Sequence, residues 1–497
     1  MEIKEFYDYN KEIAKFKAAY ALVEWDMRTK MPPKAAMDRS EVAGKLARTM
    51  FDMETSSKMA AFVEYFNRPK INEKLNEIDR RNVYLVTKEY RRISAIPPDK
   101  FEKFTIACSN GENVWQEAKA ESNFSKFKPY LEEIVGYLKE FVEYYGYEEN
   151  KYDALLEDYE PSMTTKDLNK IIAGLKAELV PFIKDLNSKG NAPDTSILKG
   201  NFDKNSQEKL SREVLDAMGY DFKGGRIDET VHPFTIGMGF GDVRITTNYH
   251  SDDMTSALFS TMHEGGHALY EQGVSEAYKW MPIHDGASMG IHESQSRTWE
   301  NLVGRSRPFW NFFFPKLCEI FPQFKNVSSD EFYKAINLTK PSLIRIESDE
   351  VTYNLHIMVR FEIEEAIIND RIKVADLPDA WNEKMKAYLG IDVPDDAHGM
   401  LQDVHWSGGQ LGYFPSYMLG NLYASQFFFT AKKEIPNLDS EIANGNLKVL
   451  REWQREKIHK FGALYDPKDL LIKVTGEPLN HKFFMNYVRE KFSKIYF

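Results

Sequence analysis

The chain has 497 residues, of which 42% are hydrophobic and 28% are charged. These proportions are typical of a folded globular protein and exclude collagen-like, low-complexity and largely disordered chains. Acidic residues outnumber basic ones by 76 to 65, and the resulting net charge of −11 argues against a nucleic acid or an anionic membrane as partner.

Cysteine usage and hydropathy favour an intracellular protein. Cys108 and Cys318 are the only cysteines, which excludes a disulfide framework and a Cys-rich zinc module and favours a reducing compartment. The N-terminus is charged and lacks the apolar run of a secretory signal. No run approaches the roughly 18 apolar residues that span a bilayer. We therefore expect a cytoplasmic location and no membrane partner.

The first part of the chain, to about residue 190, predicts one helix after another. Thr164 and Asp167 form a capping-box signature in front of one of them. Apolar residues at helical spacing also run through 1–50, 56–95, 99–120 and 125–147, with interruptions at Pro32-Pro33 and Pro97-Pro98.

The segment from about 190 to 250 has a different composition, rich in Gly, Asn, Pro and Asp. Two short runs in it predict β-strands, Thr230–Thr235 and Val243–Thr247. Helical spacing returns at Met254 and continues to the C-terminus. The expected fold class is therefore mainly α with one small β-sheet. Because no linker rich in Pro, Gly or Ser occurs, we expect residues 1–497 to form a single catalytic unit.

Histidines indicate where the chemistry lies, because nine of the eleven fall between His232 and His405. Within this region, residues 263–267 read His-Glu-Gly-Gly-His, an HExxH sequence. Residues four apart share one face of a helix, so His263 and His267 can reach one cation. Glu264 can then act as general base on a water at the metal. Two half-buried histidines on an ordinary helix are the alternative interpretation.

The residues around HExxH predict a helix over Asp253–Gln272 that contains two adjacent glycines. Gly265 and Gly266 each disfavour a helix by about 1 kcal/mol relative to alanine. Such a cost in mid-helix indicates that another segment approaches the backbone closely.

A third metal ligand must come from outside this helix. Glu293, at the start of a helical stretch that runs to about Leu302, is the best candidate, and Glu300 is the second. Glu271 is better placed to orient a ligand than to bind the ion, and Glu276 lies in an expected loop.

Short motifs occur in a fixed order along much of the chain. They are His232-Pro233-Phe234, Asp242–Thr246 (DxRxT), His263–His267, His292–Gln295, Ile344–Asp349 (IRxxAD), Gly399–Trp406 (GxxQDxHW) and Gly412–Pro415. In this combination they resemble the M32 metallocarboxypeptidases, the family of thermostable carboxypeptidase 1. One departure is Ser348, which stands where the family pattern usually has Ala.

The resemblance implies an enzyme that removes single residues from the free C-terminus of peptides, with broad specificity and poor action next to proline. It implies a helical fold similar to neurolysin and angiotensin-converting enzyme, with a deep groove, and a homodimer. The metal ligands would be His263, His267 and Glu293, with Glu264 as general base. Zinc is the usual metal, and cobalt often supports activity in this family.

Two arginines inside these motifs suit recognition of a carboxylate, because a guanidinium pairs with it in a planar, bidentate way. Arg345, in front of a helical stretch over Asp349–Ile368, is our first choice. Arg244 is the second, with a local ion pair to Asp242 as its alternative role.

Other residues of the motifs have expected roles near the metal. His232 and Tyr413 are candidates to donate hydrogen bonds to the scissile carbonyl oxygen. Asp403 and His405 are candidates to orient metal ligands. We also expect Val243–Thr247 to be an edge strand that pairs with an extended substrate. An oligopeptidase that cuts internal bonds is the competing function, and a non-catalytic peptide-binding protein is a third.

Overall fold

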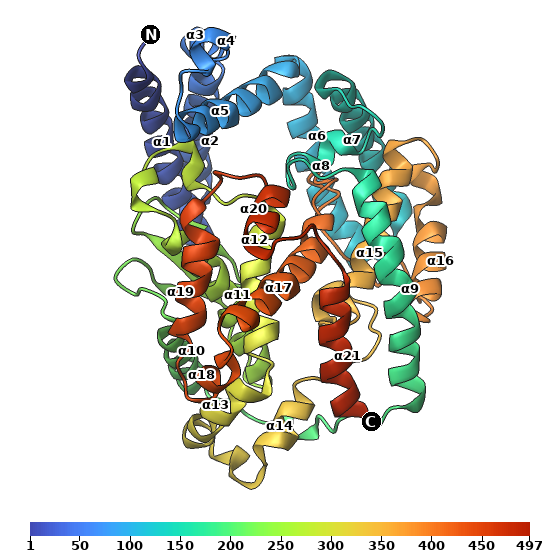
Figure 1. Cartoon of the computed structure of the whole chain (residues 1–497). Coiled ribbons are helices and arrows are strands. Elements are labelled where there is room, and N and C mark those ends of the chain that lie inside the picture. Colours follow the sequence, from blue (N-terminus) through green and yellow to red (C-terminus); the bar gives the residue numbers. More distant parts are fainter.

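Helices dominate the computed structural model, which describes residues 1–497 (Figure 1). The N-terminal helices end close to the expected positions, since Pro33 follows the first helix and Pro98 opens the sixth. They are α1 (Ile3–Thr29), α2 (Ala36–Glu54), α3 (Ser57–Phe66), α4 (Pro69–Asn72), α5 (Glu77–Ala95), α6 (Pro98–Ala120), α7 (Phe124–Tyr145), α8 (Asp153–Leu156), α9 (Thr165–Lys189) and α10 (Lys204–Met218).

The C-terminal half is also helical, as its spacing predicts. It begins with α11, whose bounds differ from the expected 253–272 by one residue at each end. Its helices are α11 (Met254–Gly273), α12 (Met289–Arg297), α13 (Arg307–Ile320), α14 (Ser329–Ala335), α15 (Tyr353–Ile368), α16 (Leu377–Leu389), α17 (Pro415–Glu434), α18 (Leu438–Ala443), α19 (Lys448–Lys457), α20 (Pro467–Thr475) and α21 (Lys482–Tyr496). No helix of this fold combines the length and the apolar character that a membrane crossing requires.

Between α10 and α11 the chain forms one three-stranded sheet, in the order β1-β3-β2. Its strands are β1 (Ile227–Glu229), β2 (Thr235–Gly237) and β3 (Val243–Thr247). β1 pairs with β3 in parallel and β2 pairs with it antiparallel, with Ile236 opposite Arg244.

Two expectations about this sheet are wrong. The strand expected over Thr230–Thr235 is instead mostly the connection between β1 and β2. The chain has to reverse there, and Pro233 has no N–H to give to a ladder. β3 has the expected bounds but is the central strand rather than an edge, because the expected strand order did not include β1. The edge next to α11 is β2.

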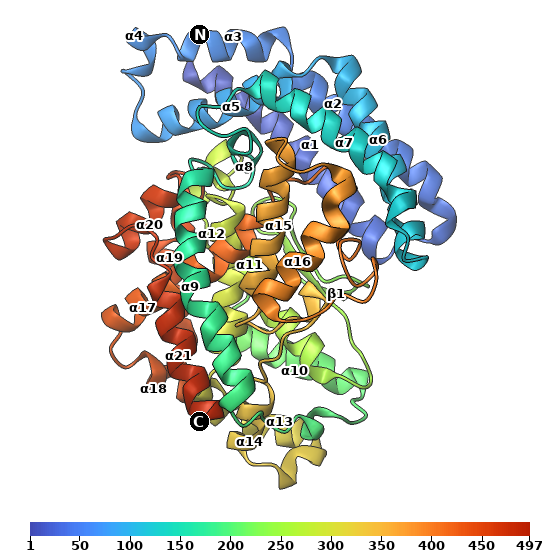
Figure 2. The same ribbon diagram turned by 90° about the vertical axis from the view of Figure 1, so that its right-hand side faces the viewer.

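Two hydrophobic clusters form the main cores. The large one contains 96 buried residues and runs from Ile96 to Tyr496, across the change in composition near residue 190. A separate cluster of seven lies within α1, α3 and α5, formed by Phe6, Ile13, Met59, Phe62, Phe66, Val83 and Val86. Figure 2 shows α1 to α7 extending across one end of the molecule, over the helices that follow.

Candidate metal centre

α11 presents both histidines of the HExxH sequence on one face. Asp253 caps this helix, since its carboxylate accepts the backbone N–H groups of Thr255 and Ser256. The side chains of His263 and His267 are 19% and 18% exposed, so both remain accessible from solvent.

The adjacent glycines of α11 are explained by two neighbouring helices. A Cβ on Gly266 would lie 2.6 Å from the carbonyl oxygen of Gln295 and from the Cα of Ser296, both in α12. A Cβ on Gly265 would lie 2.7 Å from the end of Leu215 in α10. The expected close approach to the backbone is therefore confirmed, and at Gly266 it brings α12 directly against α11.

A glycine of α17 repeats this arrangement on the other side of α12. A Cβ on Gly420 would lie 2.4 Å from the Cγ of Glu293. α12 is thus held between two glycine-bearing helices, and Glu293 projects from it beside the histidines.

Three side chains converge on one point. Oε2 of Glu293 lies 3.5 Å from Nε2 of His263 and 3.4 Å from Nε2 of His267, and one ligand atom from each residue falls within 4.8 Å of the others. Two imidazoles and a carboxylate are the donor set of a hydrolytic zinc site with room for water. The residues therefore fit a divalent metal ion.

The second ring nitrogen of each histidine is engaged elsewhere. Nδ1 of His263 lies 2.9 Å from Oε2 of Glu300, and Nδ1 of His267 lies 2.7 Å from Nδ1 of His292. Nε2 of His292 in turn lies 3.5 Å from Oε1 of Glu271. Such contacts turn both Nε2 atoms toward the shared point. Glu300, the second choice as ligand, thus lies on the far side of His263.

Arg297 joins the carboxylates on α12 and the π-helical turn Thr298–Val303 that continues it. Its Nε donates to Oε1 of Glu293 at 2.6 Å, and its Nη1 donates to Oε2 of Glu300 at 3.2 Å. Burial alone would raise the pKa of Glu300, but Arg297 and His263 outweigh it and hold this pKa at about 2. Arg297 was not among the residues expected at this site, although its position four residues after Glu293 was a usable signal.

Glu264 is fixed by a contact that was not expected from the sequence. The Thr235 hydroxyl, from β2, donates to Oε2 of Glu264 at 2.6 Å. Glu264 is only 7% exposed, and this burial raises the pKa of its carboxyl, with His263 opposing the rise. Burial also lowers the pKa of His267 to about 3, so its imidazole is neutral, as metal binding requires.

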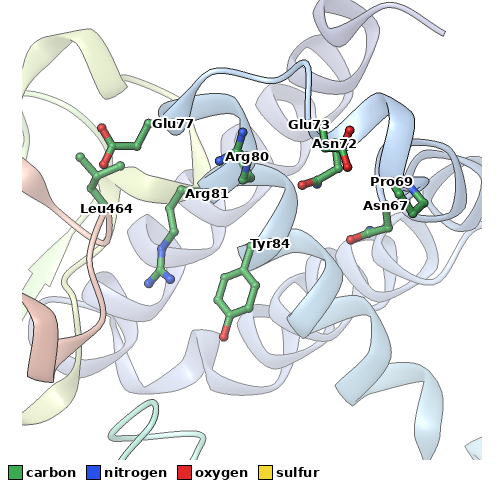
Figure 3. Close-up of a pocket in the computed structure, with 9 residues that line it drawn as sticks. All are labelled: Asn67, Pro69, Asn72, Glu73, Glu77, Arg80, Arg81, Tyr84 and Leu464. Atoms are coloured by element: carbon green, nitrogen blue, oxygen red, sulfur yellow. The ribbon is translucent and has the colours of Figure 1, made fainter.

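A groove opens beside this centre. It is a cavity of about 630 Å³ between α1 and α5 on one side and the segment around α11 and α12 on the other, and Glu271 and His292 line it. A second cavity of similar volume lies along α4 and α5 (Figure 3), where Arg80, Arg81 and Tyr84 line it together with six other residues. No residue of the metal centre reaches the second cavity.

Arg345 lies deep in the protein and connects to the metal centre through Tyr353. Its Nη1 donates to the Tyr353 hydroxyl at 2.8 Å, and the guanidinium of Arg297 lies 4.6 Å from the centre of the Tyr353 ring. Two bonds from its Nε and Nη2 to Asp403 hold the guanidinium in place. Asp403 therefore orients an arginine rather than a metal-binding histidine.

The remaining candidates lie in different surroundings. Arg244 forms the local bidentate pair with Asp242, at 2.8 and 2.7 Å. His232 is exposed in the bend before β2, and its imidazole forms no hydrogen bond. Tyr413 stacks on His405 with ring centroids 5.5 Å apart. Burial raises the pKa of the Tyr413 hydroxyl to about 12, so it is a hydrogen-bond donor at neutral pH.

Ser348, the one departure from the motif pattern, has partners for its hydroxyl. Its Oγ donates to the carbonyl oxygen of Ile344 at 3.1 Å and lies 2.9 Å from Oγ of Ser342. The polar atom is therefore accommodated in the turn that carries Arg345.

Comparisons with known proteins extend this picture to the whole chain. A family model described as carboxypeptidase Taq (M32) metallopeptidase matches residues 5–492. Carboxypeptidase 1 of Bacillus subtilis is 44% identical over 99% of this chain and 98% of its own length. Thermostable carboxypeptidase 1 of Thermus thermophilus is 40% identical over 98% of each chain. A structure of Pyrococcus furiosus carboxypeptidase superposes with a TM-score of 0.96 at 36% identity, covering 99% of this chain and 98% of that one.

Proposed function

Since this chain belongs to the M32 family of metallocarboxypeptidases, it is a peptide hydrolase, and we propose that it releases single amino acids from peptide C-termini with zinc bound by His263, His267 and Glu293. The observation that carries this assignment is the convergence of both Nε2 atoms on Oε2 of Glu293. When bound there, zinc supplies Lewis-acid polarisation of a carbonyl and a lowered pKa of water.

Glu264 is the proposed general base. It takes the proton of the attacking water and later gives it to the departing amine. The hydrogen bond from Thr235 directs one oxygen of this carboxylate, and burial favours its protonated form once the proton has been taken. Tyr413 and His232 are proposed donors to the oxygen of the scissile carbonyl.

The free edge of β2 is the proposed binding strand for extended substrate. The backbone N–H of Thr246 donates to the carbonyl of Phe234, and that of Met238 donates to the carbonyl of Asp242. The peptide groups of Ile236, which lies between Phe234 and Met238, therefore also face β3. By alternation the peptide groups of Thr235 and Gly237 point the other way. An extended peptide that adds to this edge would run beside Glu264.

Arg345 is the proposed receptor for the C-terminal carboxylate. A guanidinium has five N–H donors, and the three hydrogen bonds from Arg345 side-chain nitrogens to Asp403 and Tyr353 leave two for a ligand. Arg244, whose Nε and Nη2 pair with Asp242 as those of Arg345 pair with Asp403, is the second candidate. A buried arginine that selects a free carboxylate favours a carboxypeptidase over the alternative, an oligopeptidase that cuts internal bonds.

The remaining parts of the proposal rest on the family resemblance and the composition. We propose broad specificity with poor cleavage next to proline, activity with cobalt as well as zinc, and a cytoplasmic homodimer. We also propose that residues 1–497 act as one catalytic unit, in which the part before about residue 190 forms one wall of the groove.

Matched peptides test the function directly. A peptide acid and its C-terminal amide are incubated with the metal-loaded protein and analysed by mass spectrometry, with and without chelator. We expect stepwise loss of residues from the acid only, abolished by chelator and restored by zinc or cobalt. Cleavage of both peptides at internal bonds would support the oligopeptidase instead. In Arg345→Ala, an unchanged preference for the acid would refute the carboxylate receptor.

A further inference from the structure

Behind the proposed carboxylate receptor, two arginines share one acidic side chain. Nε and Nη2 of Arg345 donate to Oδ1 of Asp403 at 3.0 and 2.8 Å. Nε of Arg360, in α15, donates to Oδ2 of the same carboxylate at 2.7 Å. The side chains of Arg345, Arg360 and Asp403 are 7%, 0% and 11% exposed. We call these three residues the Arg–Asp–Arg cluster.

Nη2 of Arg360 also lies 2.5 Å from Oδ2 of Asp403, and neutral groups accept the other hydrogen bonds of this guanidinium. Its Nη1 donates to the backbone carbonyl of His356 and its Nη2 donates to Oε1 of Gln402, both at 2.8 Å. The same Gln402 oxygen accepts the backbone N–H of Arg345, also at 2.8 Å. Arg360 is therefore fixed inside the protein.

Another buried acid on the same helix as Arg360 is committed to other partners. Glu364 follows Arg360 by one turn of α15, but one of its oxygens accepts from Trp406 at 2.7 Å, and the other accepts from Tyr152 at 2.6 Å and from the amide of Gly412 at 3.0 Å. It forms no ion pair with a guanidinium. Burial also raises the pKa of Glu364 to about 7, which reduces its negative charge at neutral pH.

The histidines next to the cluster add no charge. Burial, together with the two arginines, lowers the pKa of His356 well below its ordinary value and lowers that of His405 to about 4. The Arg–Asp–Arg cluster thus holds two positive charges against one negative charge in a buried setting.

We propose that Arg360 is a positioning residue for the carboxylate receptor, because it shares Asp403 with Arg345 and so leaves a net positive charge on the receptor. If Arg345 and Asp403 were paired alone, they would be neutral and would attract a third charge weakly. Asp403 orients Arg345, and Arg360 offsets the charge of Asp403. This inference rests on the proposed role of Arg345, and it explains why a guanidinium that is already bound to a carboxylate can still bind a second one.

Binding of a matched acid and amide tests the charge directly. N-acetyl-L-phenylalanine and its amide are titrated into the metal-loaded protein and into variants Arg360→Gln and Arg360→Lys. For Arg360→Gln we expect the affinity for the acid to fall by about tenfold or more, with little change for the amide, because one buried charge is lost. Arg360→Lys keeps the charge and should keep most of the preference for the acid.

Each outcome decides between the possible roles. A purely structural Arg360 would weaken acid and amide alike, and an unchanged acid-to-amide ratio in Arg360→Gln overturns the proposal. If Arg360→Gln does not fold, a folded Arg360→Lys that has lost the preference overturns it as well. Arg345→Ala distinguishes a failure of the proposed carboxylate receptor from a failure of the charge role of Arg360. A ratio that survives this substitution refutes the receptor itself, whereas a ratio lost there but kept in Arg360→Gln refutes only the charge role of Arg360.

Discussion

Replacing Gly266 by alanine is expected to push apart the two helices that carry the proposed metal ligands. The new Cβ would lie 2.6 Å from two backbone atoms of α12, whereas ordinary contacts begin near 3.4 Å. Backbone atoms cannot turn away as a side chain does, so α12 has to move by roughly 0.8 Å in a closely packed interior.

The energetic result is the balance of two effects. Alanine favours the helix over glycine by about 1 kcal/mol, whereas overpacking a core costs about 1–3 kcal/mol and occasionally more. We expect Gly266→Ala to lower the free energy of unfolding by up to about 2 kcal/mol, which is the packing cost less the gain in helix propensity. Because Glu293 moves with α12, we also expect the affinity for zinc to fall by about tenfold or more.

Two other glycines provide matched controls. Gly136, inside α7, has nothing within 4 Å of an added Cβ, so Gly136→Ala should raise the free energy of unfolding by up to about 1 kcal/mol. At Gly265 the added Cβ meets only the flexible ends of Leu215 and Met218, at 2.7 and 2.9 Å, so Gly265→Ala should be nearly neutral. Urea denaturation of the metal-free protein and zinc titration measure both quantities. Wild-type zinc affinity in Gly266→Ala, with a stability gain equal to that of Gly136→Ala, would refute the reasoning.

Three further substitutions test a catalytic role, a metal-orienting role and a buried carboxyl. Glu264→Gln should keep stoichiometric metal but lose about 10²-fold or more in kcat, the scale of general acid–base catalysis; full activity by steady-state assay would exclude the proposed base. His292→Phe removes the partner of Nδ1 of His267, so zinc affinity should fall by about 10–100-fold in a chelator competition; an unchanged affinity would contradict this orienting role. Burial raises the pKa of Glu160 to about 7 from 4.5. A carboxyl whose pKa is raised by folding stabilises the folded state while it is protonated, and this contribution is lost as the pH rises. We therefore expect the free energy of unfolding to fall by about 3 kcal/mol as the pH rises from 4.5 to above 7. Glu160→Gln should remove that loss from the pH dependence of unfolding, and an identical pH profile would show that the carboxyl is not perturbed.

Local patterns in the sequence predicted local structure well. His263 and His267 share one face of α11 because of helical spacing alone. The helix starts at Thr165 and Pro98 follow from capping by Thr164 and from proline geometry. The bounds of β3 were also correct. The expected strand at 230–235 failed because β-like composition was read without the reversal that Pro233 makes possible in the chain.

Contacts between distant segments were harder to predict. Gly266 indicated that something approaches α11, but not that α12 does so. Thr235 reaches Glu264 only because β2 lies beside α11, and Arg360 reaches Asp403 over 43 positions of sequence. Such pairs depend on tertiary packing, for which a single sequence has no periodic signal.

The division of the interior into two cores bears on how a peptide reaches the groove. Seven buried side chains join α1, α3 and α5 to one another, while the helices of the metal centre belong to a cluster of 96. The smaller cluster removes less apolar surface from water and so resists local opening less. The helices α1, α3 and α5 can therefore loosen, and their amide hydrogens exchange, while α11 and α12 stay packed together in the larger cluster.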